Sequence, residues 1–350
     1  MKPKLFGSQF FILAVFLLTF YPANIWGTEQ KFKLDPIEIK AGRSLLSAKV
    51  LPSSKTIVSK EEIKKNQYLQ VRDIIRETLG TDVVSSGPLG ARASVFMRGA
   101  GTSSTLVMID GVQVNASTDG AFNFANLLTD NIERVEILRG PQSTLWGADA
   151  VGGVINIVTK KGEGTPSHFA SFEGGSFGRL KETLGSSGAL NDFDYSFTAS
   201  RTDNDGFSNA SEKLGNTEND GYEANNLSTR LGYNFMGNSR VEVIGRYINS
   251  ISNFDGFDFS TLQPIDSSAH DHSIFFYIAT PIQKYLTDWW HIRINPNMSY
   301  LQSENINPTF SNSNVYNRNY TVDVQNNFKW GDYYSATAGF EYQALNGHNV

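Results

Sequence analysis

The 350-residue sequence lacks three features that would each point to a particular class of protein. It contains no cysteine, so no disulfide can stabilise the fold and no thiolate is available for catalysis. It contains no strongly basic stretch, which argues against a nucleic-acid-binding protein. After residue 27 it contains no apolar run of about 20 residues, the length that a membrane-spanning helix needs. If the chain enters a membrane, it must therefore do so as a closed β-barrel.

The first 27 residues have the pattern of a secretory signal peptide. Lys2 and Lys4 precede an apolar stretch at residues 10–20, and small residues follow near Gly27. This order predicts export and cleavage near Gly27. A membrane anchor is the alternative, but the 11 residues of the apolar stretch are fewer than the about 20 that span a bilayer. Loss of two lysines changes the formal net charge from −5 to −7, and the remaining length suggests about two domains.

Residues 28–54 form a polar leader with little apolar periodicity, which is typical of a flexible segment. Within the leader, Ile37 and Ile39 alternate with charged residues. Such a stretch can extend and add a strand to the sheet edge of a partner protein, although Pro36 removes one backbone donor. An unstructured linker is the alternative interpretation.

Residues 55–161 are predicted to form a compact α/β domain that begins with a strand and a helix. Residues 56–58 favour a strand, and Ser59 with Glu62 makes a capping box that begins the helix. Apolar residues recur at helical spacing on one face, and Gly80 ends the helix. This face consists of Val71, Ile74, Ile75, Thr78 and Leu79.

The most informative stretch of this domain is residues 132–158. Two runs rich in β-branched residues, 135–137 and 154–157, flank glycine-rich turns, so the stretch predicts two strands. The turn at 147–153 is no phosphate loop, because it leads into a strand, whereas phosphate loops open a helix. Two earlier strands end in turns at Arg98 and Asp110. Asp110 is interpreted as a turn former, since no Ser–His–Asp or paired-carboxylate arrangement accompanies it.

From residue 168 onward, apolar and polar residues alternate over long stretches. Trp290, Ile292 and Ile294, for example, alternate with His291 and Arg293. Such alternation, with aromatic residues near the strand ends, is typical of outer-membrane barrels with an apolar outer face. A soluble β-sandwich also alternates, but its strands are shorter. Nine strands are predicted, near residues 168–176, 179–190, 192–202, 225–235, 239–250, 271–282, 288–303, 316–329 and 333–345.

The connections between these strands alternate in length. Residues 203–224, 251–270 and 304–315 are long connections, and those between them are short, including 284–287. Outer-membrane barrels have short periplasmic turns and longer extracellular loops, so the first strand is predicted to run outward from the periplasm. The sequence His-Asp-His at 270–272 is interpreted as part of a solvated loop rather than a metal or haem contact.

In combination, these motifs resemble the plug domain of TonB-dependent outer-membrane receptors, which import scarce, bulky nutrients. Four segments, at residues 96–99, 106–112, 135–141 and 147–157, follow one another in the order and at the distances of that plug. The resemblance implies an α/β plug domain followed by an antiparallel transmembrane β-barrel, and it implies no enzymatic activity. The plug-motif residues are Arg98, Gly99, Asp110, Gly111, Arg139, Gly140, Pro141, Gly147, Gly152 and Gly153.

The resemblance also implies partners and a location. The leader would hold a TonB box, which the periplasmic protein TonB grips, energised by the ExbB–ExbD complex. This box consists of Asp35, Pro36, Ile37, Glu38, Ile39, Lys40 and Ala41, of which Pro36 and Glu38 depart from the commonest pattern. The protein would act as a monomer in outer-membrane lipid and bind a small nutrient, and it would bind no nucleic acid.

The chain is predicted to be the N-terminal part of such a receptor. Nine tilted strands enclose a radius of about 9 Å, whereas a compact plug of this size has an outer radius of about 17 Å. The 22 strands of plugged transporters give a radius of about 22 Å. Residues 168–350 therefore indicate a truncated barrel. A non-functional remnant is one alternative, and a passive porin-like channel without a plug is another.

Two acidic loops resemble those of the cobalamin receptors within the family. Residues 216–222 resemble a loop that binds calcium there, and residues 253–257 resemble a second acidic loop. Clustered carboxylates suit Ca²⁺, which takes six to eight oxygen ligands, and no other cofactor is implied. The candidate ligands are Glu218, Asp220 and Asp255; Glu218 stands where aspartate is expected, and Ser208 where an acid is expected. Cobalamin or a related corrinoid is thus the preferred nutrient, with a ferric siderophore or haem as alternatives.

Overall fold

The computed structural model describes residues 54–236, 238–331 and 334–350. The predicted signal peptide at residues 1–27 and the predicted TonB box at residues 35–41 lie outside the described residues. Within the described ranges, no helix has the length and apolar character needed to cross a membrane.

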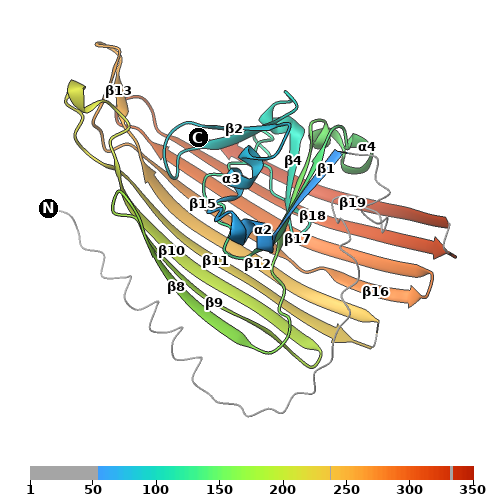
Figure 1. Ribbon diagram of the computed structural model, residues 1–350. Helices are drawn as coiled ribbons and strands as arrows, with labels where there is room; N and C mark the ends of the chain where they lie inside the picture. Colours follow the sequence, from blue (N-terminus) through green and yellow to red (C-terminus); the bar gives the residue numbers. More distant parts are fainter. Residues whose placement is uncertain (1–53, 237, 332–333) are drawn as a thin grey trace. The chain divides into compact units, whose positions relative to one another are not determined.

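A five-stranded sheet forms the centre of the first domain (Figure 1). Its order is β1-β6-β7-β4-β5, and only β4 and β7 pair in parallel. Every residue of β4 and β7 is buried, because both strands are apolar and lie inside the sheet. The stretch 132–158 forms β6 and β7, which pair antiparallel as predicted. The bounds are β1 (Ser54–Ser59), β4 (Thr105–Ile109), β5 (Val112–Gln113), β6 (Ile132–Arg139) and β7 (Gly153–Thr159).

The single helix predicted after Ser59 is wrong, because the structure has two short helices there. The capping box is present, and α2 (Lys60–Lys65) begins at Ser59. Gln67 adopts φ +55°, and the Tyr68 N–H donates to the Ile63 carbonyl, which is a helix-ending arrangement. A second helix, α3 (Val71–Arg76), follows and ends before Gly80. Leu79 therefore lies beyond α3 and is 86% exposed rather than on a buried face.

The remaining small elements complete this domain. A hairpin of β2 (Thr81–Ser85) and β3 (Ala93–Met97) stands apart from the central sheet. The described residues of this domain also form the helical turns η2 (Thr102–Ser104), α4 (Ser143–Trp146) and η3 (Ala148–Ala150), and η4 (Glu212–Leu214) lies in the second part of the chain.

A ten-stranded antiparallel sheet forms the second part of the chain, and its strands follow one another in sequence order. The nine predicted strands correspond to nine successive positions in the sheet. The strand predicted at residues 271–282, however, is divided into two shorter strands. Pro281 has no backbone N–H, so the ladder breaks there, while the register against β12 is the same on both sides. The strands are β8 (Ser167–Gly174), β9 (Leu180–Leu190), β10 (Phe193–Phe207), β11 (Asp220–Phe235), β12 (Ser239–Asn253), β15 (His270–Ala279), β16 (Ile282–Thr287), β17 (Trp290–Ile306), β18 (Ser313–Trp330) and β19 (Tyr334–Asn349).

Several predicted connections also differ from the structure. The long connections are shorter than expected, because β10 continues to Phe207 and β11 begins at Asp220. The second long connection contains a small hairpin, β13 (Gly256–Asp258) with β14 (Gln263–Ile265). Residues 284–287 belong to strand β16 rather than to a turn, and the turn follows at residues 288–289.

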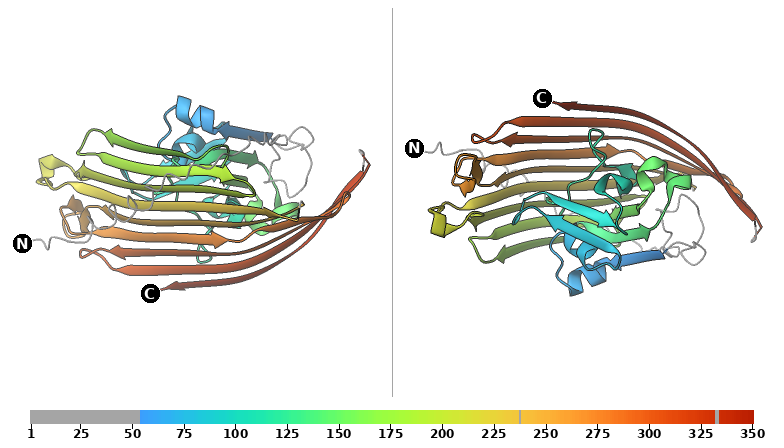
Figure 2. Two further views of the ribbon diagram at one scale, coloured as in Figure 1. Left: turned by 90° about the horizontal axis from the view of Figure 1, so that it is seen from below. Right: turned by 90° about the horizontal axis from the view of Figure 1, so that it is seen from above.

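The α/β domain packs against one face of the ten-stranded sheet, as both views of Figure 2 show. The polar residues of the alternating pattern face this domain. In β18, Asn319 and Thr321 are buried, whereas Tyr320 and Val322 are exposed on the opposite face. One apolar cluster joins the two parts, since Ile244, Phe275 and other sheet residues pack with the core of the α/β domain. The predicted polar-in, apolar-out arrangement is thus present.

Candidate functional site

An acidic cluster lies among the long connections at one end of the ten-stranded sheet. Glu218, Asp255 and Asp266 place carboxylate oxygens within 4.8 Å of one another. Asp220, the first residue of β11, lies beside Asp255. Two long connections therefore contribute: the one before β11, and the one between β12 and β15 on both sides of its β13–β14 hairpin. These four residues are called the acidic cluster below.

Backbone amides hold the carboxylates of the acidic cluster in place. The Ser267 N–H donates to Glu218 Oε1 at 2.6 Å, and the Asn209 N–H donates to Asp220 Oδ2 at 2.7 Å. The Thr217 N–H donates to Asp266 Oδ2 at 2.9 Å, and the Ala210 N–H donates to Asp255 Oδ2. The second oxygens of Asp255 and Asp266 are buried and have no hydrogen-bond partner among the described residues. The cluster thus offers oxygens that a cation can take, which suits a hard ion such as Ca²⁺.

Asp220 lies outside the part of the sheet that is apolar on its outer face. Arg201, Asp203 and Glu223 form ion pairs on the outer face of β10 and β11, with Arg201 Nη2 2.6 Å from Asp203 Oδ1. Charged outer positions mark strand ends that extend beyond a hydrocarbon layer. Asp220 precedes Glu223 at the start of β11 and therefore lies on the loop side of these charges.

Burial and neighbouring carboxylates raise the pKa values of two members of the acidic cluster. Burial, with Asp255 and Glu218 close by, raises the pKa of Asp220 to about 6. Burial and the neighbouring Asp266 and Asp255 also raise the pKa of Glu218. Like charges held together in this way favour protonation, and a bound cation removes that repulsion. A proton and a cation would therefore compete for the carboxylates of the cluster.

The structure brings together Glu218, Asp220 and Asp255, the three residues proposed from the sequence, and adds one. Asp266 was missed because it lies outside the two loop motifs, after a hairpin that folds back onto the cluster. Its position before Ser267 in a polar loop gave no spacing signal. Ser208, which stands where an acid was expected, also lies here, with its hydroxyl 3.5 Å from Asp255.

Other residues of these loops do not join the acidic cluster. The Tyr222 side chain is buried, and its hydroxyl donates to Asn126 of the α/β domain at 2.9 Å. His270 and His272 contact separate partners, the Ser268 carbonyl and Asn249. Phe257, Phe259 and Phe310 form an exposed aromatic group on the neighbouring connections.

The glycine-rich motifs of the α/β domain form turns that gather two arginines. Arg98 and Gly99 adopt φ +50° and +79° after β3, and Gly140 adopts φ +102° after β6. The Arg139 guanidinium donates to the Leu79 carbonyl at 2.6 Å. A Cβ at Gly140 would lie 3.2 Å from Arg98 Nη1, so the two turns are in contact. Burial and the charge of Arg98 lower the pKa of Arg139.

The other plug-motif residues lie in turns near β7, the last strand of this domain. Gly147 and Gly153 have φ +78° and +151°, and Gly147 follows α4. The Gly152 N–H donates to the Ser104 carbonyl at 2.8 Å, and Pro141 lies in the turn between β6 and α4. Asp110 and Gly111 form the turn between β4 and β5, and they contact the ten-stranded sheet. The motifs therefore set turns and a contact with the sheet, and they form no catalytic arrangement.

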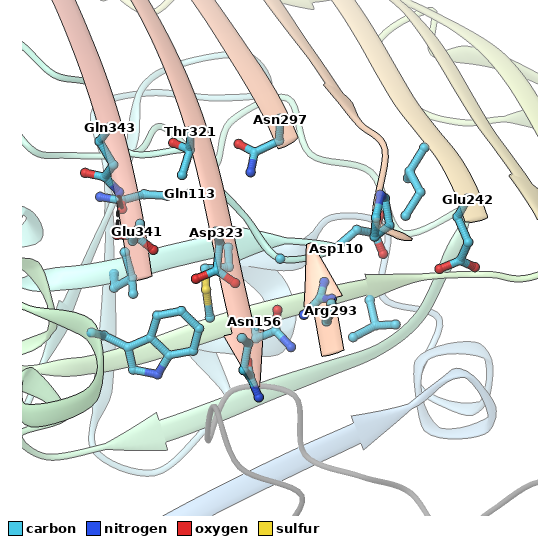
Figure 3. Close-up of a pocket in the computed structure, with 18 of the residues that line it drawn as sticks. Asp110, Gln113, Asn156, Glu242, Arg293, Asn297, Thr321, Asp323, Glu341 and Gln343 are labelled. Atoms are coloured by element: carbon cyan, nitrogen blue, oxygen red, sulfur yellow. Dashed lines mark hydrogen bonds between the residues drawn. The ribbon is translucent and has the colours of Figure 1, made fainter. Parts of the chain in front are cut away.

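A polar cavity separates the α/β domain from the inner face of β17–β19 (Figure 3). Asp110, Gln113 and Asn156 line it from one side, and Arg293 and Asp323 line it from the other. Its volume is ≈ 50 Å³, which holds a few water molecules at about 10–15 Å³ each. Binding pockets for small molecules measure about 300–1,000 Å³. The cavity is therefore smaller than a typical binding pocket for a small molecule.

Comparison with known families identifies the first domain. Residues 47–154 match the family described as TonB-dependent Receptor Plug Domain. This match includes all the plug-motif residues named above up to Gly153. The predicted family is therefore confirmed for this part of the chain.

Curated relatives extend the match into the ten-stranded sheet. The chain is 27% identical to the vitamin B12 transporter BtuB of Photobacterium profundum over 322 residues, which are 92% of this chain and 52% of that protein. It is 30% identical to the vitamin B12 transporter BtuB of Vibrio vulnificus strain CMCP6 over 226 residues, 63% of this chain and 36% of that protein. The chain thus spans about half the length, or less, of the curated relatives that it matches.

Solved structures share the fold. The ferric yersiniabactin uptake receptor FyuA of Yersinia pestis has a TM-score of 0.68 at 18% identity, covering 89% of this chain and 52% of that one. The siderophore receptor PiuA of Acinetobacter baumannii has a TM-score of 0.71 at 17% identity, covering 91% and 48%. At these identities the likeness concerns the fold alone: a plug followed by part of an antiparallel barrel.

Proposed function

Because this chain is a BtuB-like relative of the TonB-dependent receptors, with their plug domain and the first strands of their barrel, we propose that it serves active nutrient import across the bacterial outer membrane. A nutrient binds at the extracellular connections, and TonB, energised by ExbB–ExbD, pulls on the leader at residues 35–41. The plug then moves and opens a path. No bond of the nutrient is broken, so the protein is not an enzyme.

The contact between plug and barrel wall is the observation that supports transport over passive diffusion. The plug covers the inner face of the sheet, and the cavity beside it measures only ≈ 50 Å³. A porin-like channel needs an open aqueous path. With a plug in this position, a solute can pass only when another protein moves the plug. In this proposal, that protein is TonB.

A corrinoid such as cobalamin is the nutrient that we propose. The curated relatives named above are vitamin B12 transporters, and the acidic cluster lies in the loops that resembled the calcium loops of cobalamin receptors. Calcium bound by Glu218, Asp220, Asp255 and Asp266 would tie two long connections together and order the nutrient site. A ferric siderophore is the second candidate, because FyuA and PiuA are siderophore receptors, but a shared fold carries no ligand preference.

The location follows from the same proposal. The signal peptide at residues 1–27 directs export and is cleaved, and the barrel inserts as a monomer into outer-membrane lipid. Outer faces of the strands present apolar side chains, such as Tyr320 and Val322 on β18, to the hydrocarbon.

A ligand screen on the full-length protein tests the proposed function. Cells that lack their own receptors and produce the full-length protein receive labelled cobalamin, Fe(III)-siderophores or haem, each with Ca²⁺ or with a chelator. We expect cobalamin binding that Ca²⁺ strengthens, and uptake only when TonB is present. Calcium-independent binding of a siderophore would contradict the corrinoid assignment, and uptake without TonB would contradict active transport.

Two carboxylate variants sharpen this screen. Glu218→Gln removes a carboxylate from the acidic cluster and is expected to abolish the calcium effect. Asp258→Asn is the matched control, since Asp258 lies in the neighbouring hairpin and accepts hydrogen bonds from Ser260 and Thr261 of its own loop. The control is expected to bind cobalamin with the same calcium response as the parent protein.

A further inference from the structure

The Asp110–Gly111 turn of the plug is built into the inner wall of the barrel. Asp110 and Gly111 adopt φ +52° and +84°, which is the two-residue turn of a tight hairpin between β4 and β5. The Asn295 amide of β17 donates to the Gly111 carbonyl at 3.3 Å. A Cβ at Gly111 would lie 3.0 Å from Arg293 Nη2, so a side chain there would press on the wall. Glycine is therefore needed both for the turn and for the close approach.

The Asp110 carboxylate joins the plug and the wall with four contacts. Within the plug, Thr159 donates its N–H at 2.9 Å and its hydroxyl at 2.8 Å. From the wall, the Tyr277 hydroxyl donates at 2.9 Å, and Arg230 Nη1 lies 3.5 Å away. The Asp110 side chain is only 1% exposed. Its charge is thus shared between one plug strand and two wall strands, β11 and β15.

Arg230 extends this contact along the wall as a series of alternating charges. Arg230 pairs with Glu242 at 3.1 Å, and Arg240 pairs with Glu242 at 2.9 Å and with Asp194 at 2.7 Å. Lys161, just after β7, lies 4.0 Å from Asp194. The series therefore begins at Asp110 and ends at Lys161, both of which belong to the plug side of the interface.

The charge of Asp110 matters beyond its hydrogen bonds. Arg246 of β12 is buried between plug and wall, and it donates to Asn131 of the plug. Its Nε and Nη1 atoms have no hydrogen-bond partner among the described residues. A buried cation without a carboxylate partner is costly, so a nearby negative charge stabilises it. Asp110 pairs with Arg230 at 3.5 Å, and its negative charge, with that of Asp130, also stabilises the charged form of Arg246.

We propose that Asp110 is a positioning residue that holds the plug on the barrel wall in the closed state, and that its release from Tyr277 and Arg230 is a step of opening. The role in opening rests on the proposed function. The contact of Asp110 with the wall depends on neither a ligand nor TonB. Moving the turn away separates Asp110 from the wall and leaves Arg230 and Arg246 without it. Because these arginines then lack the charge of Asp110, return of the plug is favoured. The same contact therefore closes the path again.

The absence of cysteine makes the test direct. A single reporter, Gln113→Cys, is placed on β5, where Gln113 contacts Gln343 and the Ser299 hydroxyl of the wall. The full-length protein is produced in cells that lack TonB, and the reaction of the reporter with a membrane-impermeant maleimide is timed. Asp110→Asn keeps the shape of the side chain and removes its charge. Asp119→Asn is the matched control, because Asp119 pairs with Arg92 inside the plug and is half exposed.

We expect Asp110→Asn to raise the labelling rate about tenfold or more, because hydrogen bonds to charged groups contribute more than neutral ones. The Asp119→Asn control is expected to label at the rate of the parent. Equal rates for both variants would overturn the proposal. If Asp110→Asn fails to assemble, Tyr277→Phe replaces it, since that variant removes one hydroxyl from the wall and leaves the plug unchanged; it must also label faster than the control. Because labelling needs neither ligand nor TonB, a failure of the transport proposal does not affect this outcome.

Discussion

The acidic cluster predicts that calcium binding weakens as the pH falls. Burial next to Asp255 and Glu218 raises the pKa of Asp220 to about 6. A calcium ion needs the ionised carboxylate, so binding must displace the proton that Asp220 holds below this pH. Acidification from pH 7.5 to pH 5 is therefore the perturbation, and the apparent calcium affinity of the full-length protein is the measured quantity.

The magnitude follows from the ionised fraction of one carboxyl group. With a pKa of about 6, this fraction is roughly 0.97 at pH 7.5 and roughly 0.09 at pH 5. The affinity is thus expected to fall about tenfold, which corresponds to about 1.4 kcal/mol. Glu218, whose pKa is also raised, increases the loss.

Without calcium, the stability of the folded loops changes with pH in the opposite direction to the calcium affinity. The folded pKa of Asp220 lies above its unfolded value, so the folded state binds more protons between about pH 4 and pH 6. The ion-free loops therefore lose stability as the pH rises through this window, whereas added calcium stabilises them most above it. Thermal melting of the full-length protein with and without calcium at both pH values distinguishes these two trends.

Titration calorimetry of the purified protein in two buffers of different ionisation enthalpy measures both the affinity and the protons released. The Asp220→Asn variant is expected to lose most of the pH dependence, because amides do not titrate. Asp258→Asn serves as the control, since the pKa of Asp258 is lowered to about 2 by its bonds to Ser260 and Thr261, and it stays ionised throughout. An affinity that is equal at both pH values, or an undiminished pH dependence in Asp220→Asn, would refute the reasoning.

Three further predictions concern the leader and the plug. Ile39→Pro in the full-length protein is expected to abolish uptake and leave surface binding intact, because proline removes a backbone donor from the strand offered to TonB; unchanged uptake would place the TonB box elsewhere. Ser59→Ala removes the cap of α2 and should lower its local stability by about 1 kcal/mol, visible as faster amide exchange in residues 60–65 but not in β7. Gly153→Ala puts a Cβ 2.2 Å from the Leu138 carbonyl and should destabilise the plug by roughly 1–3 kcal/mol, measured as increased protease cleavage of the plug; resistance equal to the parent would show that the strand shifts freely.

The sequence predicted the parts of the fold that depend on local periodicity. Alternation along β17 and β18 predicted which face is polar, because side chains on a strand point to opposite faces in turn. The capping box of Ser59 and Glu62 predicted the start of α2 for a similar reason, since both donors lie within one turn. The interruption at Pro281 was not predicted, although proline has no backbone N–H with which to complete a ladder.

Features that depend on distant contacts could not be predicted in the same way. The break at Gln67 requires Tyr68 to bond back to Ile63, and nothing in the composition of residues 60–76 marks it. Asp266 joins the acidic cluster only because the β13–β14 hairpin folds back. Asp110 was interpreted as a turn former, which is correct, but its contact with Tyr277 spans 167 positions of sequence and carries no local signal.

The acidic cluster and the Asp110–Arg230 contact differ in the free energy that is lost when a charged partner is missing. This difference bears on their roles. In the acidic cluster, where burial and neighbouring carboxylates raise the pKa of Asp220, a proton or a cation can compensate the negative charge. Asp110 and Arg230 lie in the interface, where an unpaired charge is expensive. A site of the first kind responds to the composition of the medium, whereas one of the second kind has two states, paired or separated. In the proposed function, ligand binding is therefore tuned at the loops without loosening the plug, and the force that opens the path acts on the plug itself.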